Sequence, residues 1–353
     1  MVFKLHGFSQ MSITLLKAFA KSIRPYILMG AYFFCAQAQG QLGDSTSVQS
    51  YVDKLSFGID LGTDFDEFLV DNPDVGYFHL VTNNNVKLTL GLDYDFLSLS
   101  VGVAPKFLPG NDDDELKGKS SFQNYQVNVF PGSLVQNVFF RRMKGFYVEN
   151  TSDFLPTWSE GDPHLQFPDL KSITWGGSTG LVLNKDFSLR ALLNRQEWQL
   201  ESRGSLVPMI QYEFTKMTNN FEDNTYGKEN IVDLRVGVGY YYNWVVASKF
   251  NMAPSLRVGI GPKFSKYTLS GEVEKNDYLV AEYGAGLQLG YNTDHFYMGI
   301  IGELDGTSYR DSDSNAISNN LWRAVFYVGY RLEPPKKLND FFDRNKPVIG
   351  KPR

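Results

Sequence analysis

Hydrophobic and polar residues alternate along much of this chain, most clearly near its C-terminal end. In residues 320–332, NLWRAVFYVGYRL, one parity carries the apolar side chains Trp322, Ala324, Phe326, Val328, Tyr330 and Leu332. The other parity carries Arg323, Val325, Tyr327, Gly329 and Arg331. A period of two is typical of a β-strand with one apolar and one mostly polar face. The same pattern recurs at residues 55–62, 86–94, 97–104, 234–244, 252–260 and 283–291.

The connections between these predicted strands sort by length. Short ones lie at residues 94–96, 131–133, 184–186, 246–249 and 292–294, and long polar ones lie at 109–120, 149–166, 218–230 and 310–320. Tight turns at one end and long loops at the other are typical of an outer-membrane barrel, whereas a soluble β-sandwich has no reason to sort its turns by length. Aromatic residues cluster beside the short turns, as in an interfacial girdle: Tyr94, Phe96, Tyr242, Trp244, Phe250, Tyr291, Phe296 and Tyr330.

We therefore predict an all-β fold, a transmembrane antiparallel up-and-down β-barrel whose apolar parity faces lipid. Backbone polar groups in lipid must be paired, so the sheet has to close on itself. Two periplasmic ends require an even number of strands, but the alternation offers about thirteen candidates, and the conflict falls between Phe187 and Val232. We predict about 12 strands, with about 14 as the alternative, joined by short periplasmic turns and longer extracellular loops.

The first 38 residues have the pattern of a signal peptide. A basic region precedes the apolar stretch 26–35, YILMGAYFFC, and residues 36–38 supply a small-x-small cleavage pattern. A membrane anchor is the alternative, but a spanning helix needs about 20 apolar residues. Cleavage after Ala38 predicts an exported protein located in the cell outer membrane. Its parts are then a periplasmic N-terminal segment (39–53), the barrel (54–332) and a periplasmic tail (333–353).

Removal of the signal peptide changes the chemistry open to the chain. It takes four basic and no acidic residues from totals of 34 Lys+Arg and 39 Asp+Glu, which leaves a net charge of −9. It also removes Cys35, the only cysteine, and with it disulfides and thiol catalysis. A net negative charge without a basic block argues against nucleic acid as a partner. The partners we expect are outer-membrane lipid and, during insertion, the barrel-assembly machinery.

The tail that follows the last predicted strand begins with two prolines. Pro334 and Pro335 remove two backbone donors and fix two φ angles, so the strand should stop before them. We expect a flexible end beyond them, with anchoring through Phe341 and Phe342 as the alternative.

Four stretches are more specific than alternation alone: SYVDKL (50–55), FPDL (167–170), KDFSLRALLNRQEWQLESRGS (185–205) and FYVGYRL (326–332). They resemble an uncharacterised outer-membrane β-barrel family of Bacteroidota that is known only as a domain of unknown function. The resemblance extends from Tyr51 to Leu332, and the third stretch is its most specific part. It implies an outer-membrane location and supplies neither an activity nor catalytic residues.

Polar residues gather in the stretch 190–205 and on the inward parity of later strands. Such a cluster either lines a solute path, binds a lipid headgroup, or forms paired charges that fill a narrow barrel, and we favour the paired charges. The candidate lumen cluster comprises Arg190, Asn194, Gln196, Glu197, Arg203, Arg235, Glu303 and Arg323.

We predict no catalytic residue, no cofactor and no metal. His79, His164 and His295 lie apart and have no cysteine partner, which argues against zinc. The acidic run NDDDE (111–115) lacks the glycine and the terminal glutamate of a calcium loop. A lipid hydrolase would need a serine beside His164, and no nucleophile motif accompanies it.

Three function classes therefore stay open for the predicted barrel. A structural or surface-interaction role comes first, a small-solute channel or transporter second, and a lipid-acting outer-membrane enzyme third. The partner beyond lipid would be a small solute or a surface ligand. A barrel of this size is plugged when large side chains face inward and conducts when glycine lines it, and the sequence holds both kinds of residue.

Overall fold

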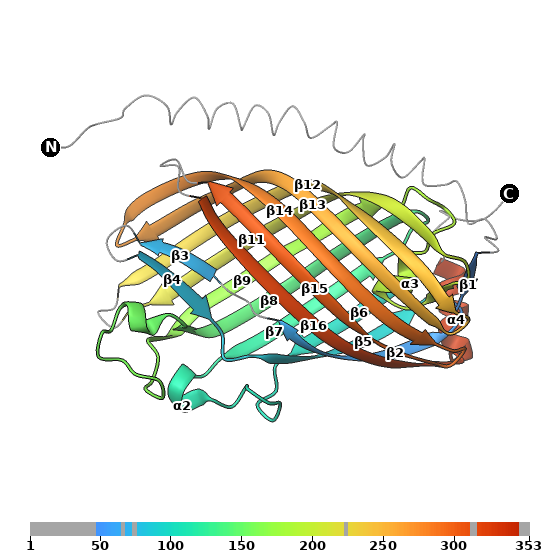
Figure 1. The fold of residues 1–353 in the computed structure, drawn as a ribbon, viewed down its shortest axis with the longest axis horizontal. Coiled ribbons are helices and arrows are strands. Elements are labelled where there is room, and N and C mark those ends of the chain that lie inside the picture. Colours follow the sequence, from blue (N-terminus) through green and yellow to red (C-terminus); the bar gives the residue numbers. More distant parts are fainter. Residues whose placement is uncertain (1–46, 65–67, 73–75, 222–224, 311–315, 346–353) are drawn as a thin grey trace.

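The computed structural model describes residues 47–64, 68–72, 76–221, 225–310 and 316–345, and the predicted signal peptide lies outside these ranges. Within them, twelve antiparallel strands close into a barrel, because each pairs with the next and the last pairs with the first (Figure 1). The predicted fold class and the strand number of twelve are confirmed. The strands are β2 (Leu55–Asp64), β5 (Val86–Tyr94), β6 (Leu97–Val103), β7 (Ser121–Val129), β8 (Leu134–Val148), β9 (Gln166–Leu181), β11 (Arg203–Asn220), β12 (Tyr226–Ala247), β13 (Phe250–Leu269), β14 (Glu272–Asn292), β15 (Phe296–Arg310) and β16 (Ala316–Leu332).

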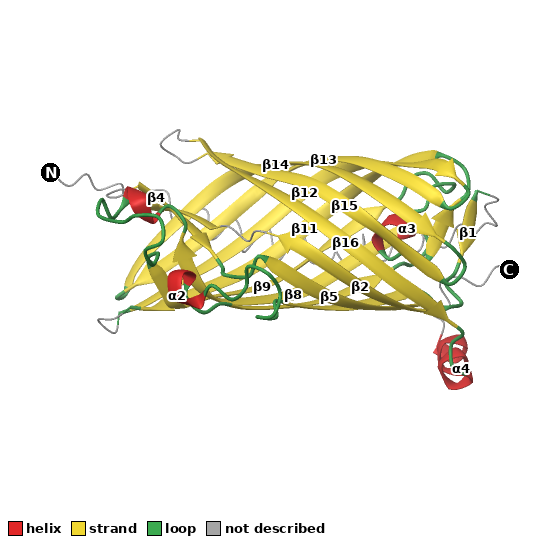
Figure 2. Ribbon diagram, turned by 60° about the horizontal axis from the view of Figure 1, so that its bottom comes forward, coloured by secondary structure: helices red, strands yellow, loops and turns green. Residues whose placement is uncertain are grey.

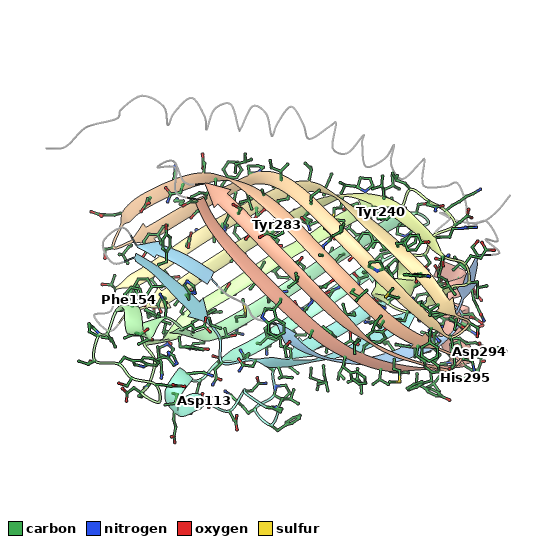
Figure 3. The ribbon with its side chains drawn as sticks, in the orientation of Figure 1. Asp113, Phe154, Tyr240, Tyr283, Asp294 and His295 are labelled. Atoms are coloured by element: carbon green, nitrogen blue, oxygen red, sulfur yellow. The ribbon has the colours of Figure 1, made fainter. Side chains whose placement is uncertain are left out.

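The two rims of the barrel differ, and we name them by their connections. At the turn end, short connections such as 95–96 and 248–249 join neighbouring strands. At the loop end lie the connection 104–120, which contains α2 (Asp114–Lys117), and the connection 149–165, which contains η1 (Thr151–Asp153). Figure 3 labels Asp294 and His295 at the turn end, and Asp113 and Phe154 at the loop end.

The strands are very unequal in length, from 7 residues in β6 to 22 in β12. Two predicted long loops, 218–230 and 310–320, were therefore wrong in extent. β11 continues to Asn220, β12 begins at Tyr226, and β15 and β16 leave a gap of residues 311–315 between them. The outer part of β12 reads YGKEN, and such polar ends carry no hydrophobic alternation, so they look like loop in the sequence.

The predicted parity of β16 is confirmed by the exposure of its side chains. Trp322 and Phe326 are 56% and 43% exposed on the outer surface, whereas Tyr327 and Arg331 are 2% and 1% exposed. Phe326 pairs with Ile300 of β15 and with Leu61 of β2, so the apolar row continues across three strands. Figure 3 labels two further side chains of this outer surface, Tyr240 and Tyr283.

Glycines on the inward parity make room for two tyrosines near the turn end. Tyr297 of β15 pairs with Gly329 of β16, and Gly299 of β15 pairs with Tyr327 of β16. A Cβ at Gly329 would lie 2.1 Å from the Tyr297 ring, and one at Gly299 would lie 2.4 Å from the Tyr327 hydroxyl. Each ring thus covers the glycine opposite it, an arrangement that fixes strand register.

A hairpin, a two-stranded sheet and a tail helix lie outside the barrel strands. The hairpin β3 (Phe68–Asn72) and β4 (Gly76–Val81) joins the loop end of β8. A short sheet of β1 (Val48–Ser50) and β10 (Glu197–Gln199) lies at the turn end. The tail forms α4 (Lys336–Asn345), so the expected flexible end is replaced, as far as residue 345, by a helix. Among the described residues, no helix is long and apolar enough to cross a membrane.

A candidate functional site in the plugged lumen

The connection between β9 and β11 does not run over the surface but folds into the barrel. Residues 182–202, which we call the plug, contain α3 (Arg190–Leu193) and β10. The plug residues Phe187, Leu189 and Leu192 are buried against the inward side chains Val207 of β11 and Ala253 of β13. Figure 2 accordingly shows α3 within the outline of the barrel near the turn end. The predicted short turn at 184–186 is only the start of this inserted segment.

Local hydrogen bonds give the plug its own structure. The Ser188 hydroxyl accepts from the Ala191 amide (2.9 Å) at the start of α3 and donates to the Glu197 carboxylate (2.6 Å). The side chain of Gln199 accepts from the Ser188 amide (2.9 Å) and donates to the Asp186 carbonyl (2.8 Å). These bonds satisfy backbone groups of an irregular segment that is buried away from water.

The N-terminal residues cover the plug from the side of the turn end. β1 pairs with β10 in antiparallel register, with Gln49 opposite Trp198. The Tyr51 amide donates to the Gln196 carbonyl (2.8 Å), and the Tyr51 ring is buried. Burial raises the pKa of the Tyr51 hydroxyl, and the nearby positive charge of Arg331 opposes that shift.

Three arginines attach the plug to the barrel wall. Arg190 donates to the Asp95 carbonyl and lies 4.8 Å from the centre of the Phe130 ring. Burial lowers the pKa of Arg190, and the negative charge of Glu197 opposes that shift. Arg195 pairs with Asp60 of β2 (3.4 Å) and stacks 4.0 Å over the Tyr327 ring.

The third arginine, Arg331, reaches the plug from β16. It donates to the Arg195 carbonyl and to the Thr293 carbonyl (2.7 Å), and its guanidinium stacks 4.0 Å over the Tyr51 ring. Hydrogen bonds to charged groups are among the stronger ones in proteins, and stacking on aromatic rings adds to them. Arg331 therefore ties the wall, the plug and the N-terminal segment together.

A second group of charges, the mid-lumen charges, lies on the inner face of the neighbouring strands β11 to β16. Arg235 of β12 contacts Glu282 (2.5 Å) and Glu213 (3.2 Å). Arg257 of β13 contacts Asp305 (2.5 Å) and Glu303 (3.3 Å), and Glu303 also pairs with Arg323 of β16. Opposite charges at these distances offset much of the cost of removing them from bulk water.

A cavity of about 320 Å³ lies on the loop-end side of the plug. Its floor is apolar and includes Leu189 and Leu193 of the plug, and its walls include Tyr241 of β12 and the paired charges Arg257 and Asp305. The cavity therefore has one hydrophobic side and one side that carries both signs of charge.

Towards the loop end, a hydrophobic cluster occupies part of the lumen beside β7, β8, β9 and β11. Phe122, Met143 and Met217 project inward from the wall, and Leu80 enters from the β3–β4 hairpin. Gly145 (φ +80°) lies at a register shift in β8, and a Cβ there would lie 2.0 Å from the Lys119 carbonyl oxygen. This bulge lets the connection 104–120 approach the wall beside the cluster.

The structure divides the eight residues of the candidate lumen cluster into separate places. Arg190, Asn194, Gln196 and Glu197 belong to the plug, and Arg235, Glu303 and Arg323 belong to the mid-lumen charges. Arg203 joins neither group, because it pairs with Glu201 at the turn end and its side chain is 43% exposed.

Several residues of the lumen were missing from the predicted cluster. The candidate cluster did not include Arg195, Asp60, Arg257, Arg331 or the pair Tyr297 and Tyr327. The signal available for Arg331 was its place on the inward parity of 320–332, where a long cation needs a partner in the lumen.

The isolated polar candidates outside the lumen have structural partners. His164 Nδ1 lies 3.1 Å from the Val148 carbonyl oxygen and 3.3 Å from the Thr151 hydroxyl, between the rings of Tyr147 and Trp158. In the acidic run 111–115, Asp114 pairs with Lys106 and accepts from the Asn83 amide group (3.2 Å). Across the described residues, no group of three or more His, Cys, Asp or Glu side chains is placed to hold a metal ion.

The closed sheet defines a β-barrel protein whose fold resembles that of bacterial outer-membrane proteins. The chain belongs to the family described as Domain of unknown function (DUF4421), which it matches over residues 43–332. No curated protein sequence matches it.

Several solved structures of outer-membrane proteins are similar in fold. The beta domain of the Bordetella autotransporter BrkA is 12% identical with a TM-score of 0.39, and the match covers 79% of this chain and 99% of that one. An outer membrane channel from Pseudomonas putida F1 is 10% identical with a TM-score of 0.35, covering 83% and 100%. The outer membrane protease OmpT from Escherichia coli is 8% identical with a TM-score of 0.32, covering 82% and 98%.

Proposed function

We propose that this protein is a non-conducting barrel of the outer membrane whose loop end faces the cell exterior and serves as an interaction surface. The observation that carries the proposal is the plug inside the turn end of the barrel. The plug occupies the turn end, charged pairs line the wall from β11 to β16, and a hydrophobic cluster occupies part of the loop end. A pore requires a continuous water path, and we propose that the plug interrupts it.

The outer surface of the barrel supports the location. Its strands carry exposed apolar side chains in rows, for example Leu61, Phe326 and Ile300 on three neighbouring strands. Exposed apolar rows of this extent would cost too much free energy in water. Lipid is therefore the first partner we propose, and the barrel-assembly machinery acts during insertion. The origin in Bacteroidota that the resemblance implies stays a prediction.

The interaction surface we propose is built from three segments at the loop end, namely β4, residues 104–120 and residues 149–165. Asn150 donates to the Tyr77 carbonyl (2.8 Å), and the rings of Phe78 and Phe154 stack 4.2 Å apart. The His164 amide donates to the Leu116 carbonyl (2.9 Å). Segments that are already ordered lose less conformational entropy when a partner binds, which suits them to recognition.

This surface also exposes apolar side chains that the packing of the loops does not use. Phe107 is 80% exposed, and Leu155 and Tyr77 are 39% and 37% exposed. An aromatic residue on an ordered, polar-rimmed surface is a common anchor for a partner.

Bilayer conductance tests the proposal. Refolded wild-type protein should give no steady conductance, whereas a variant with residues 187–198 replaced by a short Gly-Ser linker should conduct. The linker can be short, because Gln199 donates to the Asp186 carbonyl (2.8 Å), so the two ends of the deletion are close together. Lys185→Ala, at an exposed position of the plug outside the replaced residues, is the control and should stay closed. A steady open pore in the wild type would contradict the proposal.

A small-solute channel with a movable plug is the second candidate function. The observation that favours it is the cavity of about 320 Å³, whose walls carry both signs of charge beside the plug. This candidate predicts brief openings of the wild type that become more frequent when Arg331 is replaced by Met. The non-conducting proposal predicts openings only in the variant whose residues 187–198 are replaced by a linker.

The orientation is tested by cysteine labelling of intact cells. The predicted mature chain contains no cysteine. Phe107→Cys and Lys185→Cys therefore each introduce a single thiol. A membrane-impermeant maleimide should label position 107 on intact cells and position 185 only after the outer membrane is opened. The reverse pattern would place the turn end outside the cell.

We propose no enzymatic role. A lipid hydrolase centred on His164 would need a serine hydroxyl within hydrogen-bond reach of its ring, and among the described residues the hydroxyl that contacts the ring is that of Thr151. A lipase assay of the refolded protein tests this, since turnover that His164→Ala abolishes would reopen the enzyme class.

A further inference from the structure

The tail helix α4 packs against the outside of the barrel at the turn end. The ring of Phe342 lies 4.8 Å from the ring of Tyr94 and 5.7 Å from that of Phe96, and the Tyr94 hydroxyl bonds to the Asn339 side chain. Tyr94 has the same outward parity as Leu90 and Leu92 of β5, which are exposed on the outer surface. Figure 2 shows α4 outside the outline of the barrel, beside the turn end.

The helix α4 has three distinct faces: one touches the barrel, one is acidic, and one combines an aromatic residue with two cations. Phe342 and Asn339, three residues apart, share the flank that touches the barrel. Asp340 and Asp343 are also three residues apart and lie on the side opposite Phe341 and Phe342. The flank that remains carries Lys337, Phe341 and Arg344 at spacings of four and three residues, and Phe341 is 57% exposed.

We infer that α4 is an interfacial anchor that binds the phospholipid surface of the periplasmic leaflet. The helix lies at the level where the apolar outer surface ends in the aromatic side chains Tyr94 and Phe96, which is where headgroups meet acyl chains. Phe341 enters this boundary, and Lys337 and Arg344 beside it reach the lipid phosphates. The inference rests on the proposed membrane location of the barrel.

A lipid surface is the partner we infer, because the exposed Phe341 is flanked by Lys337 and Arg344 and continues the apolar outer surface of the barrel. A soluble periplasmic protein is the other partner that such a flank would fit. That partner would be present only in cells, so purified protein in vesicles separates the two.

Fluorescence quenching in vesicles tests the inference on the full chain. Three variants, Phe341→Cys, Asp343→Cys and Leu256→Cys, each carry one environment-sensitive fluorophore in vesicles of phosphatidylethanolamine and phosphatidylglycerol. Leu256 is 64% exposed on the outer surface of β13 and reports on the barrel alone. We expect iodide to quench the label at 341 several-fold less than the label at 343, and lipid-borne quenchers to show the reverse order.

Charge variants test how the helix is attached. Lys337→Glu combined with Arg344→Glu should remove the protection of the label at 341, whereas Lys336→Glu, one residue away on the water side, should not. Equal iodide quenching at 341 and 343, with position 256 still shielded, would overturn the inference and leave the barrel in the membrane. Free iodide access at 256 would overturn the proposed membrane location, and the inference with it.

Discussion

Replacement of Phe326 by Arg tests which face of the barrel meets lipid. Phe326 lies midway along the exposed apolar face of β16, four residues from Trp322 and four from Tyr330. At ~3.3 Å per residue and a strand tilt of about 40°, each of these aromatic residues lies about 10 Å from Phe326 along the membrane normal. Phe326 is therefore close to the midplane.

At that depth an arginine on the lipid face should lower the free energy of unfolding by about 2–4 kcal/mol. Val325, the next residue, has inward parity and pairs with Ile301. An arginine at 325 would meet a lumen that already holds paired charges, so Val325→Arg should cost less than Phe326→Arg. Phe326→Leu is the control for loss of the ring and should cost less than about 1.5 kcal/mol.

Reversible unfolding by denaturant in lipid vesicles measures all three variants on one scale. The informative quantity is the difference between the two arginine variants, since both share the cost of adding a cation to β16. If Val325→Arg were the more damaging change, the parity of β16 would be reversed and the pairing with β2 and β15 would be shifted by one residue.

Three further predictions concern the inside of the barrel and the tail. Arg331→Met removes the bonds to the Thr293 and Arg195 carbonyls and should lower the free energy of unfolding by about 3–5 kcal/mol, measured by denaturant titration against the wild type. Gly329→Ala should cost about 1–3 kcal/mol because the new methyl meets the Tyr297 ring, whereas Gly302→Ala, with no atom within 4 Å, should be neutral; equal costs would contradict the ring-over-glycine packing. Truncation after Glu333 should leave a barrel that still migrates differently on gels before and after boiling, because all barrel strands end by Leu332. A truncated chain that accumulates unfolded would show that the tail takes part in assembly.

The barrel itself could be predicted because its physical constraint acts on every strand in the same way. Outer positions need apolar side chains in lipid, so Phe326, Leu61 and Ile300 leave a period of two in the sequence. Two periplasmic ends then require an even strand number, which favoured twelve, with fourteen as the alternative, over thirteen. The outer end of β12 escaped this reasoning, because both of its faces carry polar residues and the alternation disappears.

The plug could not be predicted from periodicity. Phe187, Leu189 and Leu192 are buried, but they are spaced irregularly because they pack against a concave wall rather than along one face of a regular element. The conflict in the strand count fell in this part of the chain, because a segment that enters and leaves the barrel at the same end adds no strand. Polar residues such as Arg190 and Glu197 marked the right stretch without revealing that it turns inward.

The partners of the plug were out of reach because they are distant in the sequence. Arg195 and Asp60 are 135 positions apart, and the Arg331 bond to the Arg195 carbonyl spans 136. No local sequence pattern encodes such pairs, because the residues come together only when the barrel closes. The docking of α4 could not be predicted for a similar reason, because Phe342 packs against Tyr94 of the distant strand β5.

These long-range contacts also relate the plug to the closing of the barrel. β2 and β16 are the first and last strands, and they meet at the seam. Arg195 pairs with Asp60 of β2 while its carbonyl accepts from Arg331 of β16, so one residue of the plug touches both sides of that seam. This docking site is absent from an open sheet, and it exists once the two strands pair. We therefore expect the closing of the barrel and the docking of the plug to be coupled steps.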